Sequence, residues 1–144
     1  MLTLDYSAFD QDMDGGWRMV AAEERFDDAG RLIDVYLARR AAELEPNQRI
    51  LLNFHAGQMY AMADDRKLAV KRFETSIEPN PTMESWNPYV EATIAFLNRD
   101  REALLAARNA MAATPDGIMN MPVVDRLVAN LGKSYMDALR PPSQ

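Results

Sequence analysis

Four positions of this chain have a similar or identical residue 34 positions later. The pairs are Ala69 with Ala103, Phe73 with Ala107, Ser76 with Ala110, and Pro81 with Pro115. Small or apolar residues recur where two helices must touch, and a proline recurs where a helix must end. A period of this length is typical of helix-turn-helix repeats, which stack side by side and bury a shared core. It favours a binding scaffold over an enzyme.

Length and composition indicate one folded unit. The chain has 144 residues, of which 48% are hydrophobic, so we expect a single domain over residues 1–144. No run of apolar residues is long enough for a membrane span, and the first residues lack the pattern of a secretory signal. The chain has no cysteine, which permits a reducing compartment, and we expect a cytoplasmic protein.

The charge balance bears on the class of partner. The formal net charge is −6, from 22 acidic and 16 basic residues. An acidic chain repels phosphate backbones, so nucleic-acid binding is disfavoured. We expect a protein or peptide partner and no membrane partner.

Helical periodicity and breaking residues predict pairs of helices after a short lead-in at residues 1–14. In the first pair, one helix starts near Trp17 and ends near Ala29-Gly30, and the next closes at Pro46. The second pair is Gln48–Met62 and Asp65–Ile77, joined by Ala63-Asp64-Asp65 and followed by a break at 78–81. The third pair is Asn87–Leu97 and Arg99–Ala113, with Asn87 as the N-cap and Asn98-Arg99-Asp100 as the connector. No segment alternates with the period of a strand.

The last part of the chain predicts a capping helix at about residues 120–140. Pro122 opens the segment, and Gly132 resembles a C-terminal cap. Ser134 is expected to start a final turn, with Asp137 completing a capping box.

Residues 48–81 resemble a tetratricopeptide (TPR) repeat. The family pattern places a small residue and an aromatic residue on the first helix, a small, an aromatic and a small residue on the second, and a final proline. All six positions match, as Gly57, Tyr60, Ala69, Phe73, Ser76 and Pro81. The flanking units match in part, through Ala103, Ala110 and Pro115 on one side and Ala41 and Pro46 on the other.

The resemblance implies an all-α fold. We expect a right-handed stack of about three TPR-like helix pairs, at about 15–46, 47–81 and 82–115, plus the C-terminal capping helix. Three segments, FHAGQMYA, WNPYVEATIAFLNRDR and NMPVVDRLVANLGKSY, also look like a bacterial TPR-like family of unassigned function.

TPR proteins are protein-interaction modules, so the resemblance implies a non-enzymatic protein that binds a peptide or a helix. The first helix of each pair would line a concave and mostly apolar groove, through Met19, Phe26, Phe54, Gln58, Met62 and Phe96. Methionines suit such a groove because they repack around varied partners. The alternative is that the chain's own last helix fills the groove.

A second candidate site surrounds His55, the only histidine. A polar pocket of His55, Gln58, Asn87 and Tyr89 would serve a small-ligand binder or an enzyme. The alternative is that these side chains hydrogen-bond one another and fix the angle between helices.

Two further hypotheses concern self-association and calcium binding. A stripe of Val124, Leu127 and Val128 would let a structural subunit self-associate, so a homodimer is a possible assembly. Asp10, Asp12 and Asp14 resemble the first half of a calcium loop, but Ala21 stands where a bidentate glutamate is required. We therefore expect these aspartates to cap a helix, and we expect no metal and no cofactor.

Overall fold

The regular elements of the protein are all helical. The computed structural model describes residues 1–141, and no strand occurs in that range. The chain forms two compact units, Met1–Ser76 and Ile77–Gln144, each of which is described by itself. Their boundary adjoins the proline-containing break predicted at 78–81. Within the described residues, no helix combines the length and the apolar character needed to cross a membrane.

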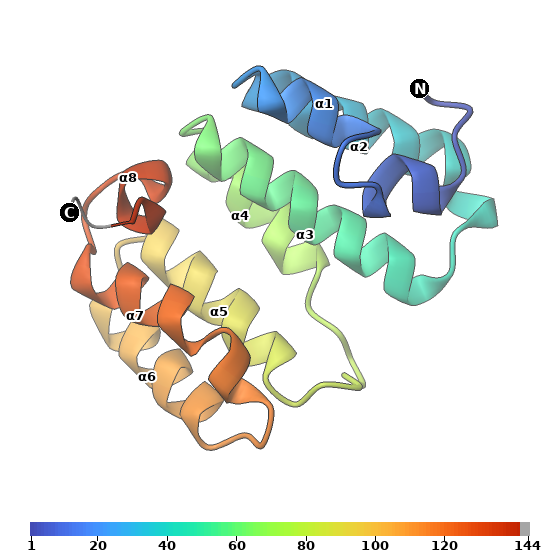
Figure 1. The fold of residues 1–144 in the computed structure, drawn as a ribbon. Coiled ribbons are helices and arrows are strands. Elements are labelled where there is room, and N and C mark those ends of the chain that lie inside the picture. The colour runs from blue at the N-terminus through green and yellow to red at the C-terminus, as the bar shows by residue number, and fades with distance from the viewer. Residues whose placement is uncertain (142–144) are drawn as a thin grey trace. The chain divides into compact units, whose positions relative to one another are not determined.

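The unit Met1–Ser76 packs its helices in chain order. They are the π-helical turn η1 (Ser7–Gln11), α1 (Trp17–Ala22), α2 (Phe26–Arg40), the 3-10 turn η2 (Ala41–Glu43), α3 (Pro46–Met62) and α4 (Arg66–Thr75). Helix α2 packs on both α1 and α3, and α3 packs on α4 (Figure 1). The unit's largest fully buried side chains are Phe9, Ile33, Tyr36, Leu52, Tyr60 and Phe73.

The lead-in predicted at residues 1–14 is part of this core. Phe9 is completely buried, and its ring stacks on Tyr36 of α2 with centroids 3.7 Å apart. The Tyr36 hydroxyl donates to the backbone oxygen of Leu4 at 2.9 Å, and Arg40 donates to the same oxygen at 3.1 Å. Side chains of α2 thus donate hydrogen bonds to the backbone of the N-terminal segment, which is defined here as residues 1–12.

The first predicted pair has the wrong boundary. Helix α1 ends at Ala22 rather than near Gly30, because Glu24 takes the left-handed conformation with φ 60°. Gly30 lies inside α2, where a Cβ would stand 3.0 Å from the ring of Tyr60. Gly30 is therefore a packing residue for a neighbouring helix, not a helix terminus. Pro46 likewise begins α3 instead of closing the preceding segment.

The second pair follows its prediction closely. Helix α3 ends at Met62 as expected, and Asp65 caps α4 by accepting a hydrogen bond from the Leu68 amide at 3.2 Å. Gly57 allows close approach of the helices, since a Cβ there would lie 2.8 Å from the ring of Phe73. Ala69, Phe73 and Ser76 are completely buried along the predicted seam of α4.

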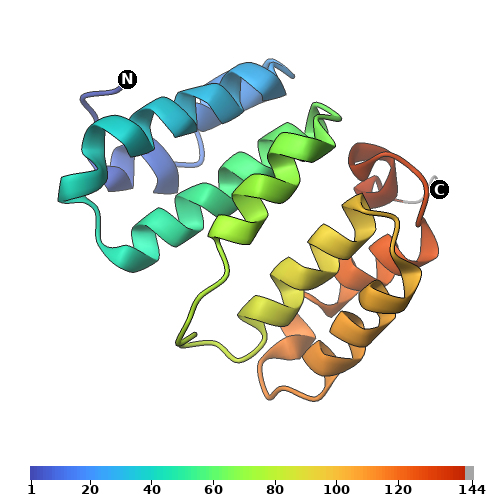
Figure 2. The ribbon, with the colours of Figure 1, turned by 180° about the vertical axis from the view of Figure 1, so that it is seen from behind.

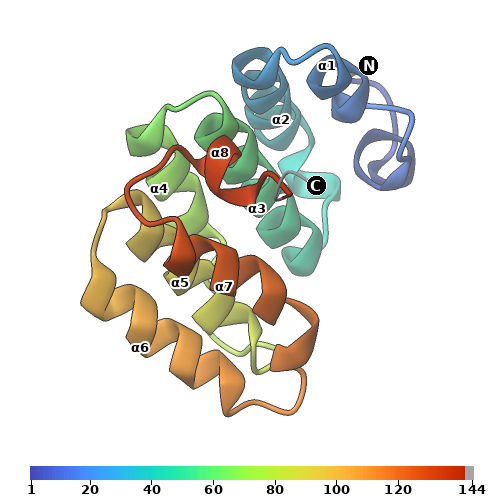
Figure 3. The same ribbon diagram turned by 60° about the vertical axis from the view of Figure 1, so that its left-hand side comes forward.

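The unit Ile77–Gln144 contains α5 (Trp86–Leu97), α6 (Arg101–Ala112), the 3-10 turn η3 (Gly117–Met119), α7 (Met121–Ala129) and α8 (Tyr135–Leu139). Figure 2 shows α5 and α6 as an antiparallel pair, and Figure 3 shows α7 beside α5. Helix α7 packs on both members of the pair, and α8 packs on α7. The buried core includes Val90, Leu104, Met111, Val124 and Leu127.

Two predictions for the third pair are corrected. Ser85, not Asn87, is the N-cap of α5, and its hydroxyl donates to the Asp116 carboxylate at 2.7 Å. In α6, Ala103 and Ala110 are exposed, while Leu104 and Met111 are completely buried. The larger apolar side chains occupy the interior because they bury more surface than alanine does. The 34-residue match of small residues therefore does not mark the same buried face in both units.

The C-terminal segment predicted at about 120–140 consists of two short helices. A turn in which Gly132 has φ 98° separates α7 from α8, close to the break that the predicted cap at Gly132 and the predicted start at Ser134 indicate. Ser134 starts α8 as predicted, and its hydroxyl accepts from the Asp137 amide at 3.2 Å. Val124 and Leu127 are completely buried, so the stripe predicted for self-association belongs to the core.

One turn geometry occurs three times, between α1 and α2, α3 and α4, and α5 and α6. Its central residue is Glu24, Asp64 or Arg99, with φ of 60°, 60° and 56°. In the second turn, the Asp65 amide donates to the Tyr60 oxygen and the Asp64 amide to the Ala61 oxygen, at 2.9 and 3.1 Å. The same two hydrogen bonds recur in the other turns. They form a Schellman motif, a common ending of α-helices.

These turns yield a stability prediction. Left-handed backbone is unfavourable for arginine and nearly free for glycine, so Arg99→Gly is expected to raise the free energy of unfolding by about 1 kcal/mol. The neighbouring Asp100 caps α6 by accepting from the Ala103 amide at 3.0 Å. Asp100→Ala is therefore the matched control and is expected to lower stability by about 1 kcal/mol. Urea denaturation followed by circular dichroism measures both; an Arg99→Gly variant less stable than wild type would contradict the strained turn.

Candidate functional site

The most highly connected polar group in Met1–Ser76 is the carboxylate of Asp10. Asp10 lies in η1 and is 0% exposed. Its Oδ1 accepts a hydrogen bond from Trp17 Nε1 at 2.8 Å and lies 2.7 Å from His55 Nδ1. Its Oδ2 accepts from Gln11 Nε2 at 2.6 Å. One carboxylate therefore joins the π-helical turn to α1 and to α3.

Arg18 adds a positive charge beside this cluster. Its Nη1 donates to the backbone oxygen of Asp10 at 2.6 Å and lies 3.9 Å from the Asp10 Oδ1. Its guanidinium carbon stands 4.2 Å from the centroid of the Trp17 ring. The arginine thus offsets part of the buried negative charge while stacking on an aromatic side chain.

The local backbone brings these groups together. Gly16 has φ 56°, and a Cβ there would lie 1.9 Å from the backbone oxygen of Phe9. Only glycine fits this position, because the chain turns back on itself between η1 and α1. The turn returns the Trp17 indole to the carboxylate seven residues before it. His55 reaches the same carboxylate from the middle of α3, 45 residues later.

The environment keeps Asp10 ionised. Burial alone would raise the pKa of this carboxyl, but the hydrogen bonds and charge of His55, with the hydrogen bonds from Trp17 and Gln11, outweigh it and lower the pKa. The same negative charge acts on Tyr6, whose pKa is raised by burial and by Asp10. The cluster therefore contains a carboxylate at neutral pH and a neutral phenol.

The predicted polar pocket is divided between the two units. His55 and Gln58 lie on α3, while Asn87 and Tyr89 lie on α5. The Asn87 side chain accepts from the Glu78 amide at 2.9 Å and donates to the Glu78 oxygen at 2.7 Å, which holds the segment before α5. His55 is held by Asp10, and a joint pocket of the four residues stays a prediction.

The predicted groove residues differ widely in exposure. Met19 on α1 is 54% exposed, and Phe26, Gln58 and Met62 are half-buried. Phe54 and Phe96 are only 4% and 3% exposed. In their own units, Phe54 contacts the ring of Phe73, and Phe96 contacts the ring of Tyr135 from α8. These two phenylalanines belong to the packing of the helices.

A second polar cluster joins three helices of Met1–Ser76. The Tyr60 hydroxyl donates to Asp34 Oδ2 at 2.6 Å. The Arg72 guanidinium binds both oxygens of Asp34, at 2.7 and 2.9 Å. The pKa of Tyr60 is raised by burial and by this carboxylate. Asp34 thus ties α2 to α3 and α4 through a bidentate contact, the strongest geometry for an arginine–carboxylate pair.

The aspartates near the N-terminus neither cap α1 nor line a cation site. The N-cap of α1 is Gly16, which has no side-chain hydrogen bond, so the predicted capping is wrong. Asp10 points into the core, and Asp12 accepts from the Asp14 amide at 3.0 Å. Among residues 1–141, no group of three or more histidine, aspartate or glutamate side chains is arranged to hold a metal ion.

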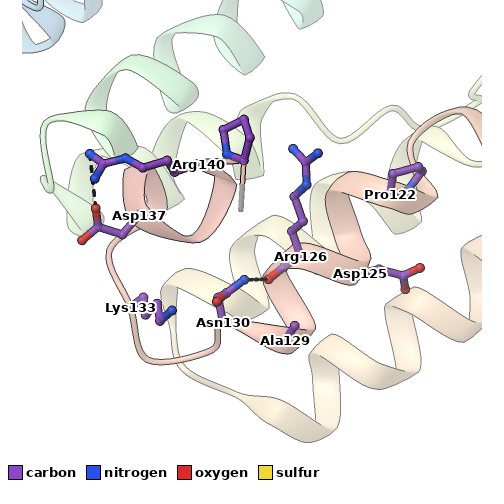
Figure 4. Close-up of a pocket in the computed structure, with 9 residues that line it drawn as sticks. Pro122, Asp125, Arg126, Ala129, Asn130, Lys133, Asp137 and Arg140 are labelled. Carbon is purple, nitrogen blue, oxygen red and sulfur yellow. Dashed lines mark hydrogen bonds and ion pairs between the residues drawn. The ribbon is translucent and has the colours of Figure 1, made fainter. Parts of the chain in front are cut away.

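A surface cleft lies beside α7 and α8 in the unit Ile77–Gln144 (Figure 4). Its charged lining residues are Asp125, Arg126, Lys133, Asp137 and Arg140. Asp137 pairs with Arg140 at 3.6 Å, and Asp125 accepts from Arg108 at 3.0 Å. Both carboxylates are thus engaged with arginines at the surface, where such pairs contribute at most about 1 kcal/mol.

No protein-family model matches the chain, and no curated protein or solved structure is significantly similar to it. The function of these clusters is therefore argued from their geometry and charges.

The Asp10 cluster yields a prediction for stability. Asp10→Asn removes the buried charge and one acceptor while the three side-chain donors stay in place, so we expect the free energy of unfolding to fall by about 3 kcal/mol. Asp14→Asn is the matched control, because Asp14 is an exposed aspartate four residues after Asp10, and its stability should stay within about 0.5 kcal/mol of wild type. Urea denaturation at neutral pH measures both variants. Equal stabilities for the two variants would contradict a structural role for the buried carboxylate.

The lowered pKa of Asp10 also predicts a pH dependence. The folded-state pKa lies below the unfolded value of about 3.9, so ionised Asp10 stabilises the fold fully above that pH. Its contribution is lost as the pH falls through the folded-state pKa. The stability difference between wild type and Asp10→Asn should therefore shrink as the pH falls from about 3.9 through the folded-state pKa. A difference that stays the same or grows over that acid range would contradict the assignment.

Proposed function

We propose that this protein is a non-enzymatic interaction module of TPR-like helix pairs, stacked in a right-handed sense, that binds a peptide or a helix. The observation that carries the proposal is the turn that recurs between α1 and α2, α3 and α4, and α5 and α6. Three helix pairs that share one connecting turn support the proposal, because a stack of repeated helix pairs needs a recurring connection. The second and third of these residues, Asp64 and Arg99, are 35 positions apart, close to the 34-residue period.

The packing of the second pair supports the TPR-like interpretation. Gly57 and Ala69 are the small residues that let α3 and α4 approach, and Tyr60 and Phe73 are the buried aromatic residues beside them. The small and aromatic residues of these two helices thus support the TPR-like interpretation. Ser76, the small residue that follows Phe73 in the pattern, is completely buried and donates to the Phe73 oxygen at 2.7 Å.

The accessible apolar residues of Met1–Ser76 suggest where a partner binds. Of the predicted groove residues, Met19 is the most exposed, and Phe26 borders a surface hollow of about 300 Å³ that also contacts Ala63. Met62 precedes Ala63 at the end of α3. A partner would place an apolar anchor against these side chains, as helices and peptides do in apolar grooves.

Charge indicates the flanking residues of that partner. The hollow is bordered by Glu24, Asp27 and Asp28, and by one cation, Arg25. Arg25 is already paired with Asp28 at 2.9 Å. Asp27 is paired with Arg31 at 2.7 Å, which leaves the Glu24 carboxylate without an ion pair among residues 1–141. Because Glu24 borders the hollow and the net charge is −6, we expect basic residues next to the apolar anchor.

Peptide selection tests the proposed groove. A random peptide library displayed on phage is selected on the immobilised wild-type protein, and the affinity of the enriched peptide is measured by calorimetry. Met19→Glu is expected to weaken binding about tenfold, because it removes an apolar contact and adds a charge at the groove.

Val35→Glu is the matched control for this substitution. Val35 is also apolar and 41% exposed, but it lies on α2 outside the predicted groove. Its variant should bind within about twofold of wild type. If no peptide is enriched, or if both variants lose affinity equally, the proposed groove is wrong.

A further inference from the structure

The chain's only histidine is held in one orientation by a buried charge. His55 Nδ1 lies 2.7 Å from Asp10 Oδ1. An ionised carboxylate accepts hydrogen bonds and donates none, so the proton of this contact belongs to Nδ1. The neutral imidazole then has its lone pair on Nε2.

The second ring nitrogen is accessible. The His55 side chain is 13% exposed, and the described part of the chain offers no hydrogen bond to Nε2. In that same part, every buried side-chain nitrogen or oxygen has a partner. Nε2 is therefore not among the buried atoms and borders solvent.

Aromatic neighbours restrict the ring itself. The imidazole lies 5.3 Å from the Trp17 ring at an interplanar angle of 42°, and 6.3 Å from the Phe54 ring at 61°. Trp17 donates to the same Asp10 oxygen that faces His55. Rotation of the imidazole would break the contact with Asp10, so Nε2 keeps a fixed direction.

We propose that His55 is a nucleophilic histidine that accepts an acyl group at Nε2 from an activated carbonyl compound, with Asp10 as its positioning residue. A carboxylate that holds one imidazole nitrogen leaves the other as the basic and nucleophilic atom. The proposal is independent of the interaction groove, since it concerns one residue of α3 and its buried partner.

The reaction balances without a further reactant. The Nε2 lone pair forms a bond to the carbonyl carbon, and the bond from that carbon to its leaving oxygen breaks with its electron pair. The imidazole becomes a cation whose Nδ1 proton faces the Asp10 carboxylate. Loss of this proton to water neutralises the ring, and the leaving group takes up a proton from water.

Diethyl pyrocarbonate is the probe for this site. It transfers a carbethoxy group to imidazole nitrogen, and the released ethyl carbonate decomposes to carbon dioxide and ethanol. Because the chain has one histidine, the ultraviolet signal of carbethoxyimidazole reports on His55 alone. Wild-type protein is expected to react at least as fast as N-acetylhistidine, although the side chain is largely covered.

Two variants separate positioning from general destabilisation. Asp10→Asn is expected to slow carbethoxylation about tenfold, because the ring loses the carboxylate that fixes its tautomer. Asp34→Asn removes a carboxylate from the other polar cluster of the same unit and should leave the rate unchanged. Nitrogen-15 NMR of the imidazole should show Nδ1–H in wild type and in Asp34→Asn, and a mixture of tautomers in Asp10→Asn.

Three results would overturn the proposal. They are a wild-type rate below that of N-acetylhistidine, an equal loss of rate in both variants, and an Nε2–H tautomer in wild type. The first and third need no variant, so the proposal can be refuted even if Asp10→Asn does not fold.

Discussion

A single buried carboxylate determines how the N-terminal unit is assembled. Asp10 is completely buried, and ionised carboxylates in that position are unfavourable by several kcal/mol unless donors surround them. Trp17 and His55 supply those donors from α1 and α3, and Arg18 adds a cation at 3.9 Å. None of these contacts exists unless the N-terminal segment folds back onto the unit. The contacts of the buried charge therefore fix where the N-terminal segment docks on the unit. The stacking of Phe9 on Tyr36 adds buried apolar surface to the same contact.

Close packing of helices positions the second polar cluster, which consists of Asp34, Tyr60 and Arg72. Gly30 allows the Tyr60 ring to approach α2, and this approach brings the Tyr60 hydroxyl within 2.6 Å of Asp34. Arg72 of α4 then completes the cluster through both Asp34 oxygens. Small residues on one helix thus position polar groups on the next. Packing and hydrogen bonding are coupled, because a bulkier residue at position 30 would separate the phenol from its acceptor.

The sequence predicted the elements whose signals are local. The bounds of α3 and α4, the connectors at Asp64 and Arg99, and the start of α8 at Ser134 follow from caps and helical spacing within a few residues. The first turn was misplaced because glycine was expected at the left-handed position, whereas Glu24 occupies it. Left-handed backbone is uncommon for such a residue, and composition alone does not reveal it.

The candidate site could not be predicted fully, because its side chains contact residues that are far away in the sequence. His55 was predicted either to line a polar pocket or to hydrogen-bond the other residues of that pocket. Its hydrogen-bond partner is instead Asp10, 45 positions away, in a segment predicted as a lead-in whose aspartates cap a helix. Phe54 and Phe96 carried the pattern of groove residues, yet their rings pack on Phe73 and Tyr135. Helical spacing gives the face on which a side chain lies. Whether that face meets a partner or the chain itself is decided by tertiary packing.

A double-mutant cycle on Asp10 and His55 tests the central claim most directly. Free energies of unfolding are measured for wild type, Asp10→Asn, His55→Gln and the double variant. If the carboxylate holds the N-terminal segment through this contact, the coupling energy will be about 1.5 kcal/mol or more. Additive effects, with a coupling energy near zero, would show that the two side chains stabilise the unit independently and would contradict the account.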